Sequence, residues 1–394
     1  MKNISFKLLA LSLLFVLSLS ACKDRQKYYE GVYIVGTEGK DVTATLTVDA
    51  LPSAIGINVA SSDLVNQDVT VNMEVRDDLV EAFNQEHHKN YSVLPKGAYK
   101  IDNQTLCIEE GKHVTTEALR VSIINKDDMK MGTTYLLPIS IKEVSDKGLS
   151  VIEGSRTIYV VVNQIIVTQA ADLVSTGSYY IADFSTPSKF DTKALKQVTF
   201  EARVRFKKMI PTSRKWCFSV MGLEENFCLR TAGSASDGWK LQLGDPNHVD
   251  SRDILPNDKW VHLACVFNGE TGKKYIYING ELQGETADSR PTMDLTQFYA
   301  QRGFYIGQSA NDDRYMNGYV SEARVWATAR SAAELKNNVC WVDPLSEGLV
   351  AYWRFNELSK EGGKIVTDLT GNGYNARYAG WTEPKFVEGI RCPE

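Results

Sequence analysis

Apolar and polar side chains alternate with a period of two in short segments along almost the whole chain. In the first half the clearest segments are 42–48, 69–75, 119–124, 135–141 and 157–162. In the second half the pattern recurs at 200–206, 260–268, 275–281, 320–326 and 349–355. Successive side chains of a strand point to opposite faces of a sheet, so these segments predict strands with one buried face. The chain is therefore expected to be all-β.

Only two segments predict helices. Asp78, with Glu81 three residues later, has the spacing of a helix start, and Ser331 with Glu334 has the spacing of a capping box. Strands every 10–20 residues predict an immunoglobulin-like β-sandwich over residues 31–167. The strand pattern lapses at 168–176, which is expected to be a linker. The strands of 177–394 predict a second antiparallel sandwich.

The N-terminal segment has the charge and length of an export signal. Lys2 and Lys7 precede an apolar run at 8–19, which is too short to cross about 30 Å of hydrocarbon. The run ends in Leu19-Ser20-Ala21-Cys22, which resembles the lipobox of bacterial lipoproteins. The resemblance implies that residues 1–21 are a signal peptide, that Cys22 carries the lipid, and that 22–30 is a lipidated tether. The alternative is an ordinary secretory signal with an incidental cysteine.

Charge narrows the range of partners. Removing residues 1–21 takes away two lysines, so the formal net charge changes from −5 to −7. An acidic chain without a Lys/Arg-rich stripe is not expected to bind nucleic acid. Outside the signal no run of about 18 apolar residues occurs, so the expected membrane contact is the lipid anchor alone.

Six cysteines remain besides Cys22, and export would place them in an oxidising compartment. Two disulfides are candidates, one joining Cys217 to Cys228 across a hairpin tip and one joining Cys340 to Cys392. Cys265 lies among apolar neighbours in a predicted strand and is expected to be a buried thiol. No Cys-x-x-Cys pattern is present, which disfavours zinc.

Four spaced segments of the second half carry a family resemblance. They are Trp260-x-His262-x-Ala264-x-x-Phe267-Asn268-Gly269, Tyr277-Ile278-Asn279-Gly280, the segment 318–326, and Ala329-Arg330-Ser331. In this order they resemble the laminin-G-like, concanavalin A-like jelly rolls. The resemblance implies that fold for residues 177–394. The segment 368–373 (DLTGNG) lies near the C-terminus, whereas members of the family often carry a similar motif near the start.

The first half also resembles a known family. The segments VYIVG (32–36), VEAFNQ (80–85), YSVLPKGAY (91–99) and YLLPISI (135–141) are similar to an N-terminal domain of unknown function. That domain occurs on Bacteroidetes surface lipoproteins encoded in polysaccharide-utilisation loci. The resemblance implies an outer-membrane lipoprotein that faces the cell exterior, with a glycan importer or glycosidases as its partners.

An enzyme on the same jelly roll is the first alternative. Retaining glycosidases need two carboxyl groups about 5–5.5 Å apart, supplied in one such family by a Glu-x-Asp-x-x-Glu strand. No such motif occurs in this chain. Glu322 is expected to be a structural partner of Arg324 or of a turn, Glu224 and Glu225 are expected to be solvated at a hairpin tip, and His262 is expected to be hydrogen-bonded or core.

Binding is better supported, because loop aromatic rings can stack on sugar rings while polar neighbours bind hydroxyl groups. The residues predicted to bind a glycan are Tyr299, Arg302, Asp312, Arg314 and Tyr315. Trp239 and Trp381 also fall in or beside loops, whereas Trp260, Trp326 and Trp353 belong to strand motifs and are expected in the core. Some laminin-G-like domains bind Ca²⁺. The candidate ligands in this chain are Asp312 with Asp313, or Asp368 with Asn372. The alternative is that no metal is bound.

The sequence thus favours a non-catalytic, lipid-anchored protein that captures oligosaccharide or polysaccharide for uptake and degradation. A divergent glycoside hydrolase and a protein-binding adhesin module remain the alternatives.

Overall fold

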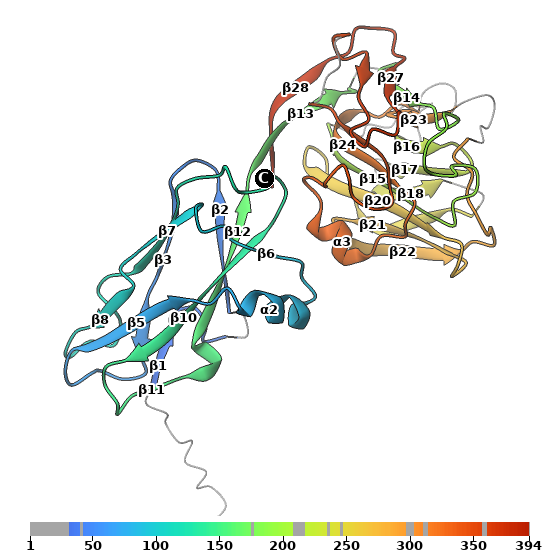
Figure 1. Cartoon of the computed structure of the whole chain (residues 1–394). Helices are drawn as coiled ribbons and strands as arrows, with labels where there is room; N and C mark the ends of the chain where they lie inside the picture. The colour runs from blue at the N-terminus through green and yellow to red at the C-terminus, as the bar shows by residue number, and fades with distance from the viewer. Residues whose placement is uncertain are drawn as a thin grey trace, which may run out of the picture. The chain divides into compact units, whose positions relative to one another are not determined.

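The structure is a computed structural model and divides into two compact units. The first unit consists mainly of residues up to 162, and the second mainly of residues from 163 onward. Figure 1 shows both units as layers of strands. The described residues are 31–39, 42–174, 177–207, 217–234, 237–244, 247–296, 303–309, 314–356 and 361–393. No helix within these ranges is long and apolar enough to cross a membrane.

The first unit is a β-sandwich whose largest sheet has six strands. Its order is β2-β12-β10-β5-β8, and β6 pairs with β10. The bounds are β2 (Thr43–Val48), β12 (Thr157–Gln164), β10 (Tyr135–Val144), β5 (Val69–Val75), β8 (Thr105–Ile108) and β6 (Ser92–Val93). All five strands predicted in this half are present within a few residues of the expected bounds.

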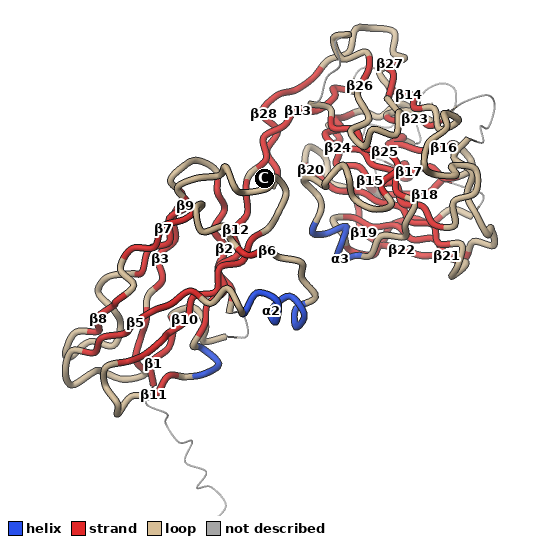
Figure 2. Tube along the Cα trace, viewed as in Figure 1, coloured by secondary structure: helices blue, strands red, loops and turns tan. Residues whose placement is uncertain are grey.

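Two three-stranded sheets complete the first unit. They are β3 (Ser53–Ile57), β9 (Leu119–Ile123) and β7 (Tyr99–Asp102), and β11 (Ser150–Val151), β1 (Gly31–Ile34) and β4 (Val59–Ser61). Apolar side chains from these sheets and from the six-stranded sheet share one buried core. The predicted helix is α2 (Leu79–His87), shown in blue in Figure 2, and its Phe83 packs on Tyr159 with ring centroids 4.5 Å apart. A one-turn 3₁₀ helix, η1 (Glu153–Ser155), precedes β12.

The second unit is a sandwich of two eight-stranded sheets. The β15 sheet contains β22 (Glu281–Ala287), β21 (Lys273–Ile278), β20 (Trp260–Asn268), β15 (Gln197–Phe206), β24 (Gly318–Trp326), β13 (Ile166–Asp172) and β28 (Phe386–Cys392) in order, with β25 (Leu349–Arg354) beside β24. The β17 sheet contains β19 (Val249–Ile254), β18 (Gly238–Gly244), β17 (Phe227–Ser234), β16 (Ser219–Leu223), β23 (Phe304–Ile306), β14 (Tyr180–Ala182), β27 (Ala376–Tyr378) and β26 (Ile365–Val366).

The core of the second unit lies between these sheets. Phe200, Ala202, Val204 and Phe206 all face it, as their alternation predicted. The Phe200 ring meets Phe227 of the other sheet edge-on, with centroids 5.0 Å apart. Burying each such ring contributes about 1.5–3 kcal/mol, so this layer dominates the stability of the unit.

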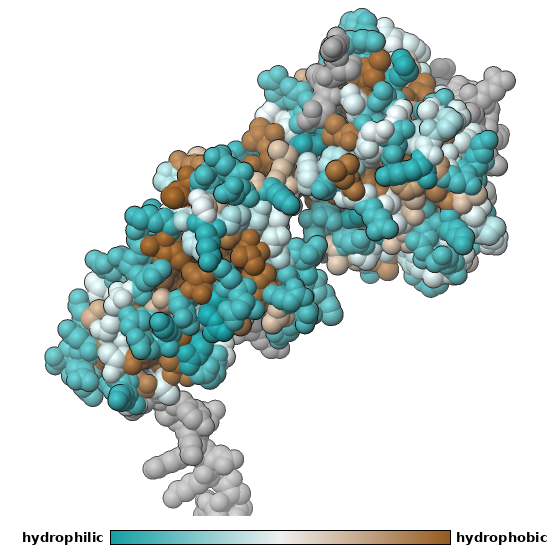
Figure 3. Space-filling view, viewed as in Figure 1, coloured by the Kyte–Doolittle hydropathy of each residue, from teal (hydrophilic) through white to brown (hydrophobic). Residues whose placement is uncertain are grey.

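The visible surface is largely hydrophilic, with apolar residues in small patches (Figure 3).

The outer face of the β15 sheet carries buried ion pairs. Glu201 contacts His262 Nε2 at 2.9 Å and Arg324 at 3.4 Å, and Glu322 contacts Arg324 at 2.9 Å. The structural roles predicted for Glu322 and His262 are therefore confirmed. Burial by itself raises the pKa of the Glu201 carboxyl, but Arg324, His262 and Arg330 outweigh burial and hold that pKa below its usual range.

A short helix, α3 (Ala332–Asn337), covers part of this outer face, and Leu335 packs against Val266 and Tyr277. Its predicted capping box is present between Ser331 and Glu334. The turn between β21 and β22 has Asn279 and Gly280 at φ 51° and 76°. A Cβ on Gly280 would lie 2.6 Å from Lys336 Cβ, so the turn requires glycine.

Two expectations about the chain's connections are corrected. The segment 168–176 is not a linker, because residues 166–172 form β13, which pairs with β28 and β24. The pair Cys217 and Cys228 is not a disulfide; both are buried free thiols. Gly222 is paired with Cys228, whereas Phe218 is hydrogen-bonded to Thr231, so the two cysteines do not lie opposite each other in the hairpin.

The other predicted disulfide is present. Cys340 and Cys392 are bonded, with their Cα atoms 5.5 Å apart. The bond attaches β28, which forms the edge of the β15 sheet, to the segment that follows α3. Cys265, as predicted, is a buried thiol in the core.

Replacing Cys340 by Ser should lower the free energy of unfolding of the second unit by about 4 kcal/mol, because the bond closes a loop of 52 residues. Urea denaturation followed by tryptophan fluorescence measures the loss. Cys107→Ser, at an exposed free thiol, is the matched control and should change nothing. Equal stability of the Cys340 variant and the wild type would contradict the assignment.

Candidate functional site

The outer face of the β17 sheet carries a polar row. Register places Ser219 opposite Arg230, Arg230 opposite Gln242, and Gln242 opposite Asp250, on four neighbouring strands. The residues between them, such as Leu229 and Leu243, face the core. Alternation therefore aligns these four polar side chains across the sheet on the side away from the core.

Arg230 is the centre of this row. It is 3% exposed, and it donates from Nε to Gln242 Oε1 at 2.8 Å and from Nη1 to Glu224 Oε1 at 3.0 Å. Gln242 in turn donates to Asp250 Oδ1 at 2.8 Å. A Cβ on Gly244 would lie 2.4 Å from Arg230 Nε, so the guanidinium occupies space that only glycine leaves open.

Glu224 joins this row to a distant loop. Its Oε1 accepts hydrogen bonds from both Arg230 and Arg314, although Arg314 lies ninety residues away in the sequence. The Glu224 side chain is 4% exposed and the Arg314 side chain 25%. The expectation that Glu224 is solvated is therefore wrong, whereas Glu225 is exposed as expected. A buried carboxylate between two guanidinium groups fixes the Arg314 side chain at the surface.

Two thiols lie close to these charges. Burial raises the pKa of Cys217 to about 11, against the smaller opposing effect of Arg230 and Arg314. Burial also raises the pKa of Cys228 well above its usual range. The raised pKa values disfavour the thiolate form of both cysteines, so neither is activated as a nucleophile. Among the described residues no group of three or more metal-ligating side chains is found.

Aromatic rings gather beside the polar row. Tyr179 lies 5.6 Å from Tyr305 and 6.0 Å from Tyr315, measured between ring centroids, and Tyr315 lies 6.2 Å from Trp381. Tyr305 is on β23, and it is paired with Gly222 of β16. Trp381 is 77% exposed, while Tyr315 is 5% exposed. Tyr315 thus meets the open indole ring edge-on, and Tyr179 connects Tyr315 to Tyr305.

The Trp381 ring is also held from behind by backbone. Gly177 has φ +85°, and a Cβ there would lie 3.0 Å from the indole. The backbone N–H of Trp381 donates to the Gly177 carbonyl at 3.1 Å. Close packing against a glycine lets the ring lie flat on the chain, so its position is fixed although its surface is open to solvent.

The structure brings together two of the five residues predicted to bind a glycan. Arg314 and Tyr315 both lie at this face, Arg314 through Glu224 and Tyr315 through the aromatic group. The other three, Tyr299, Arg302 and Asp312, lie outside the described residues, as do Asp313 and Cys22. Trp239, which lies beside a loop, is not open to a ligand, because its ring is buried in the core, 4.9 Å from Phe218.

The alternative calcium ligands Asp368 and Asn372 have other roles. The Asp368 carboxylate accepts hydrogen bonds from the backbone N–H groups of Tyr352, Thr370 and Tyr374, each at 3.1 Å. The Asn372 amide donates to the Val350 carbonyl at 2.9 Å. These hydrogen bonds hold the 368–373 turn in place, so Asp368 and Asn372 have a structural role.

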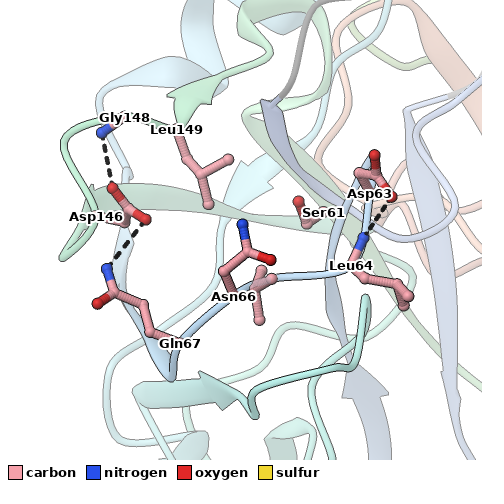
Figure 4. Close-up of a pocket in the computed structure, with 9 residues that line it drawn as sticks. Ser61, Asp63, Leu64, Asn66, Gln67, Asp146, Gly148 and Leu149 are labelled. Carbon is pink, nitrogen blue, oxygen red and sulfur yellow. Dashed lines mark hydrogen bonds between the residues drawn. The ribbon is translucent and has the colours of Figure 1, made fainter.

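The first unit contains a groove of about 530 Å³ (Figure 4). Its Asp146 accepts hydrogen bonds from Gly148 N and Gln67 Nε2, and Asp63 accepts one from Leu64 N. No aromatic ring is among its described lining residues, which are Ser61, Asp63, Leu64, Val65, Asn66, Gln67, Asp146, Gly148 and Leu149. Its polar groups serve local turns, so the outer face of the β17 sheet is the stronger candidate.

Comparisons with known proteins agree with this architecture. Residues 176–336 match the family model of the concanavalin A-like lectin/glucanase superfamily, and residues 26–148 match the model of an N-terminal domain. The fold class is all-β, an immunoglobulin-like sandwich followed by a concanavalin A-like jelly roll. No curated protein matches the sequence.

Two solved structures illustrate what this chain is similar to. A proposed carbohydrate-binding protein from Bacteroides ovatus is 24% identical, with a TM-score of 0.58 over 91% of this chain and 97% of that one. A heptameric pentraxin from Limulus polyphemus is 12% identical, with a TM-score of 0.37 over 57% of this chain and 94% of that one. The first similarity covers both units of the chain, whereas the second is too low to carry an argument.

Replacing Glu224 by Gln should lower the free energy of unfolding of the second unit by about 3 kcal/mol, because the buried Arg230 charge loses its counter-charge. Thermal and urea unfolding measure the change. Glu225→Gln is the matched control, one residue away and exposed, and should stay within about 0.5 kcal/mol of the wild type. Equal losses in the two variants would refute the buried ion pair.

Proposed function

We propose that this protein is a non-catalytic glycan-binding protein whose second unit holds an oligosaccharide or polysaccharide against Trp381. The observation that carries the proposal is the exposed indole of Trp381, 77% open to solvent, in edge contact with the buried Tyr315 ring and placed beside a fixed polar row. An exposed tryptophan costs free energy unless it meets an apolar partner. The apolar C–H face of a sugar ring is such a partner.

The polar row supplies the second part of recognition. The Arg314 side chain reaches the surface from the buried Glu224, and a guanidinium offers up to five N–H donors in a fixed plane. Hydroxyl groups of a sugar stacked on Trp381 can accept from it. Because Arg314 and Tyr315 are adjacent in the chain, the donor and the aromatic support are positioned by the same segment.

The burial and pairing of the carboxyl group at this site support binding without catalysis. A retaining glycosidase needs two carboxyl groups about 5–5.5 Å apart that reach the substrate. Glu224 is buried and bound by two arginines, which is the role of a structural counter-charge rather than of a catalytic acid. The protein from Bacteroides ovatus with the same two-unit fold is itself a proposed carbohydrate-binding protein, which supports the same reading.

The location of the protein is part of the proposal. A lipid on Cys22 would anchor the chain to the outer membrane, facing the cell exterior, and residues 22–30 would be the tether. The first sandwich would act as a spacer, and the captured glycan would pass to an importer or to glycosidases. This part rests on the apolar run at 8–19 and on the lipobox-like segment that ends at Cys22.

Trp381→Ala should raise the dissociation constant for the best-bound oligosaccharide at least tenfold, a loss of about 1.4 kcal/mol, because the stacking surface is removed. Titration calorimetry after a glycan-array screen measures it. Leu345→Ala, which removes an 83% exposed apolar side chain elsewhere in the unit, is the control and should bind normally. Release of shortened product would favour a hydrolase, and silence across the array would favour an adhesin.

Cys22→Ala should move the protein from the membrane fraction to the soluble fraction of cells that express the full chain, because several acyl chains on Cys22 provide the anchor. Metabolic labelling with a radioactive fatty acid should mark the wild type and not the variant. A wild type that takes up no label would exclude the lipid anchor, and would leave glycan binding by the second unit unaffected.

A further inference from the structure

The outer face of the β15 sheet carries a second aromatic row, at the opposite side of the same sandwich. Register places Tyr319 of β24 opposite Arg205 of β15, and Arg205 opposite Trp260 of β20. Figure 1 shows these three strands as neighbours. Trp260 was expected in the core, but it lies half-buried on the outer face because its neighbour Val261 faces inward. Two aromatic rings thus flank one arginine, separated by about 9.6 Å at ~4.8 Å per strand.

Each ring is held by a guanidinium. The Arg203 side chain lies 4.6 Å from the centroid of the Trp260 ring, and Arg205 lies 5.8 Å from that of Tyr319. Arg203 is 3% exposed and donates to the Arg391 carbonyl at 2.9 Å. The buried arginine fixes the inner face of the Trp260 ring, so its remaining surface is presented in one orientation.

The charge around this row is positive. Arg203 and Arg205 occupy alternate positions of β15, Lys207 follows directly after the strand, and Lys259 is exposed beside Trp260. Among the described residues of this surface Arg205, Lys207 and Lys259 face the carboxylates of Asp172 and Asp258, whereas Arg203 is buried opposite the buried Glu322. The whole chain has a formal net charge of −5, so the surface is a local exception. We call it the basic aromatic patch.

The ion pair at the centre of the patch can exchange its partner. Arg205 donates from Nε and Nη2 to one oxygen of Asp258, at 3.0 and 2.7 Å, while the Asp258 side chain is 60% exposed. Exposed pairs of this kind contribute little to stability. A carboxylate or sulfate of a ligand could therefore take the place of Asp258 and bind the guanidinium in two-point fashion.

We propose that the basic aromatic patch is a second glycan-binding surface, and that its ligand is an acidic polysaccharide carrying carboxylate or sulfate groups. The two rings provide stacking surfaces, and the cations select the acidic sugars. It lies on the sheet opposite to the Trp381 site, so one domain can bind two chains, or two parts of one chain, at once. Such divalency raises avidity without any new contact. The proposal extends glycan binding but does not depend on the Trp381 site.

The test uses the full chain and two acidic probes, oligogalacturonate for carboxylate and chondroitin sulfate oligosaccharide for sulfate, with the best-bound neutral oligosaccharide beside them. The double variant Arg205→Gln/Lys207→Gln should weaken binding of at least one acidic probe by at least about tenfold and leave the neutral one unchanged. Trp260→Phe, which keeps a ring, should weaken it less than Trp260→Ala. Both glutamine substitutions are at partly or fully exposed side chains, so the fold should be unaffected.

Controls separate this proposal from the Trp381 site. Arg120→Gln, at an exposed arginine of the first unit, should bind every probe as the wild type does. Trp381→Ala should retain acidic binding, and raising the salt from about 0.1 M to 1 M should weaken it, because the Debye length falls from about 10 Å to 3 Å. Unchanged binding of both acidic probes by the double variant would overturn the proposal. So would duplex DNA that binds as tightly as the acidic glycans, since the patch would then recognise charge alone.

Discussion

The two sheets of the second unit are held together by the apolar layer between them, and that layer depends on strict alternation along each strand. In β15 the residues at even positions from 198 to 206 face the core, so the residues at odd positions must face outward. The same holds for β17, where Leu229 is inward and Arg230 outward. Both candidate binding surfaces are therefore consequences of the core. A one-residue slip of either strand would exchange core and surface side chains.

Buried arginines connect that core to function. Arg230 on one sheet and Arg324 on the other are each almost fully buried and paired with a glutamate. Burial of an ion pair often contributes no net stability, because desolvation offsets the attraction. The effect of such a buried pair is to fix the positions of its side chains, because the two charges are satisfied in only one arrangement. In the β17 sheet that arrangement extends through Glu224 to Arg314 and so fixes the Arg314 side chain next to Tyr315 in the chain.

Much of the fold follows from periodicity, while most of the site does not. Many of the longer strands, such as β15 and β20, are visible as alternating segments, and so is the capping box at Ser331, although the seven-residue β13 overlaps the segment expected to be a linker. β14 and β23, which carry or flank the tyrosine group, have three residues each, too few to show a period. The pairing of Glu224 with Arg314 spans ninety residues and has no local signal. Trp260 is different, because its position could have been predicted. It lies on the same face of the strand as His262 and on the opposite face from the inward Val261, so alternation indicates an outward ring.

The central claim is that a glycan lies on Trp381, and the most direct measurement follows the seven tryptophan indole N–H signals by NMR during titration with the bound oligosaccharide. The indoles differ in environment, because Trp381 is exposed whereas Trp353 is fully buried. A saturable shift of the Trp381 signal, with Trp353 and Trp326 unmoved, is the predicted result. Saturable binding that leaves the Trp381 signal in place would contradict the account.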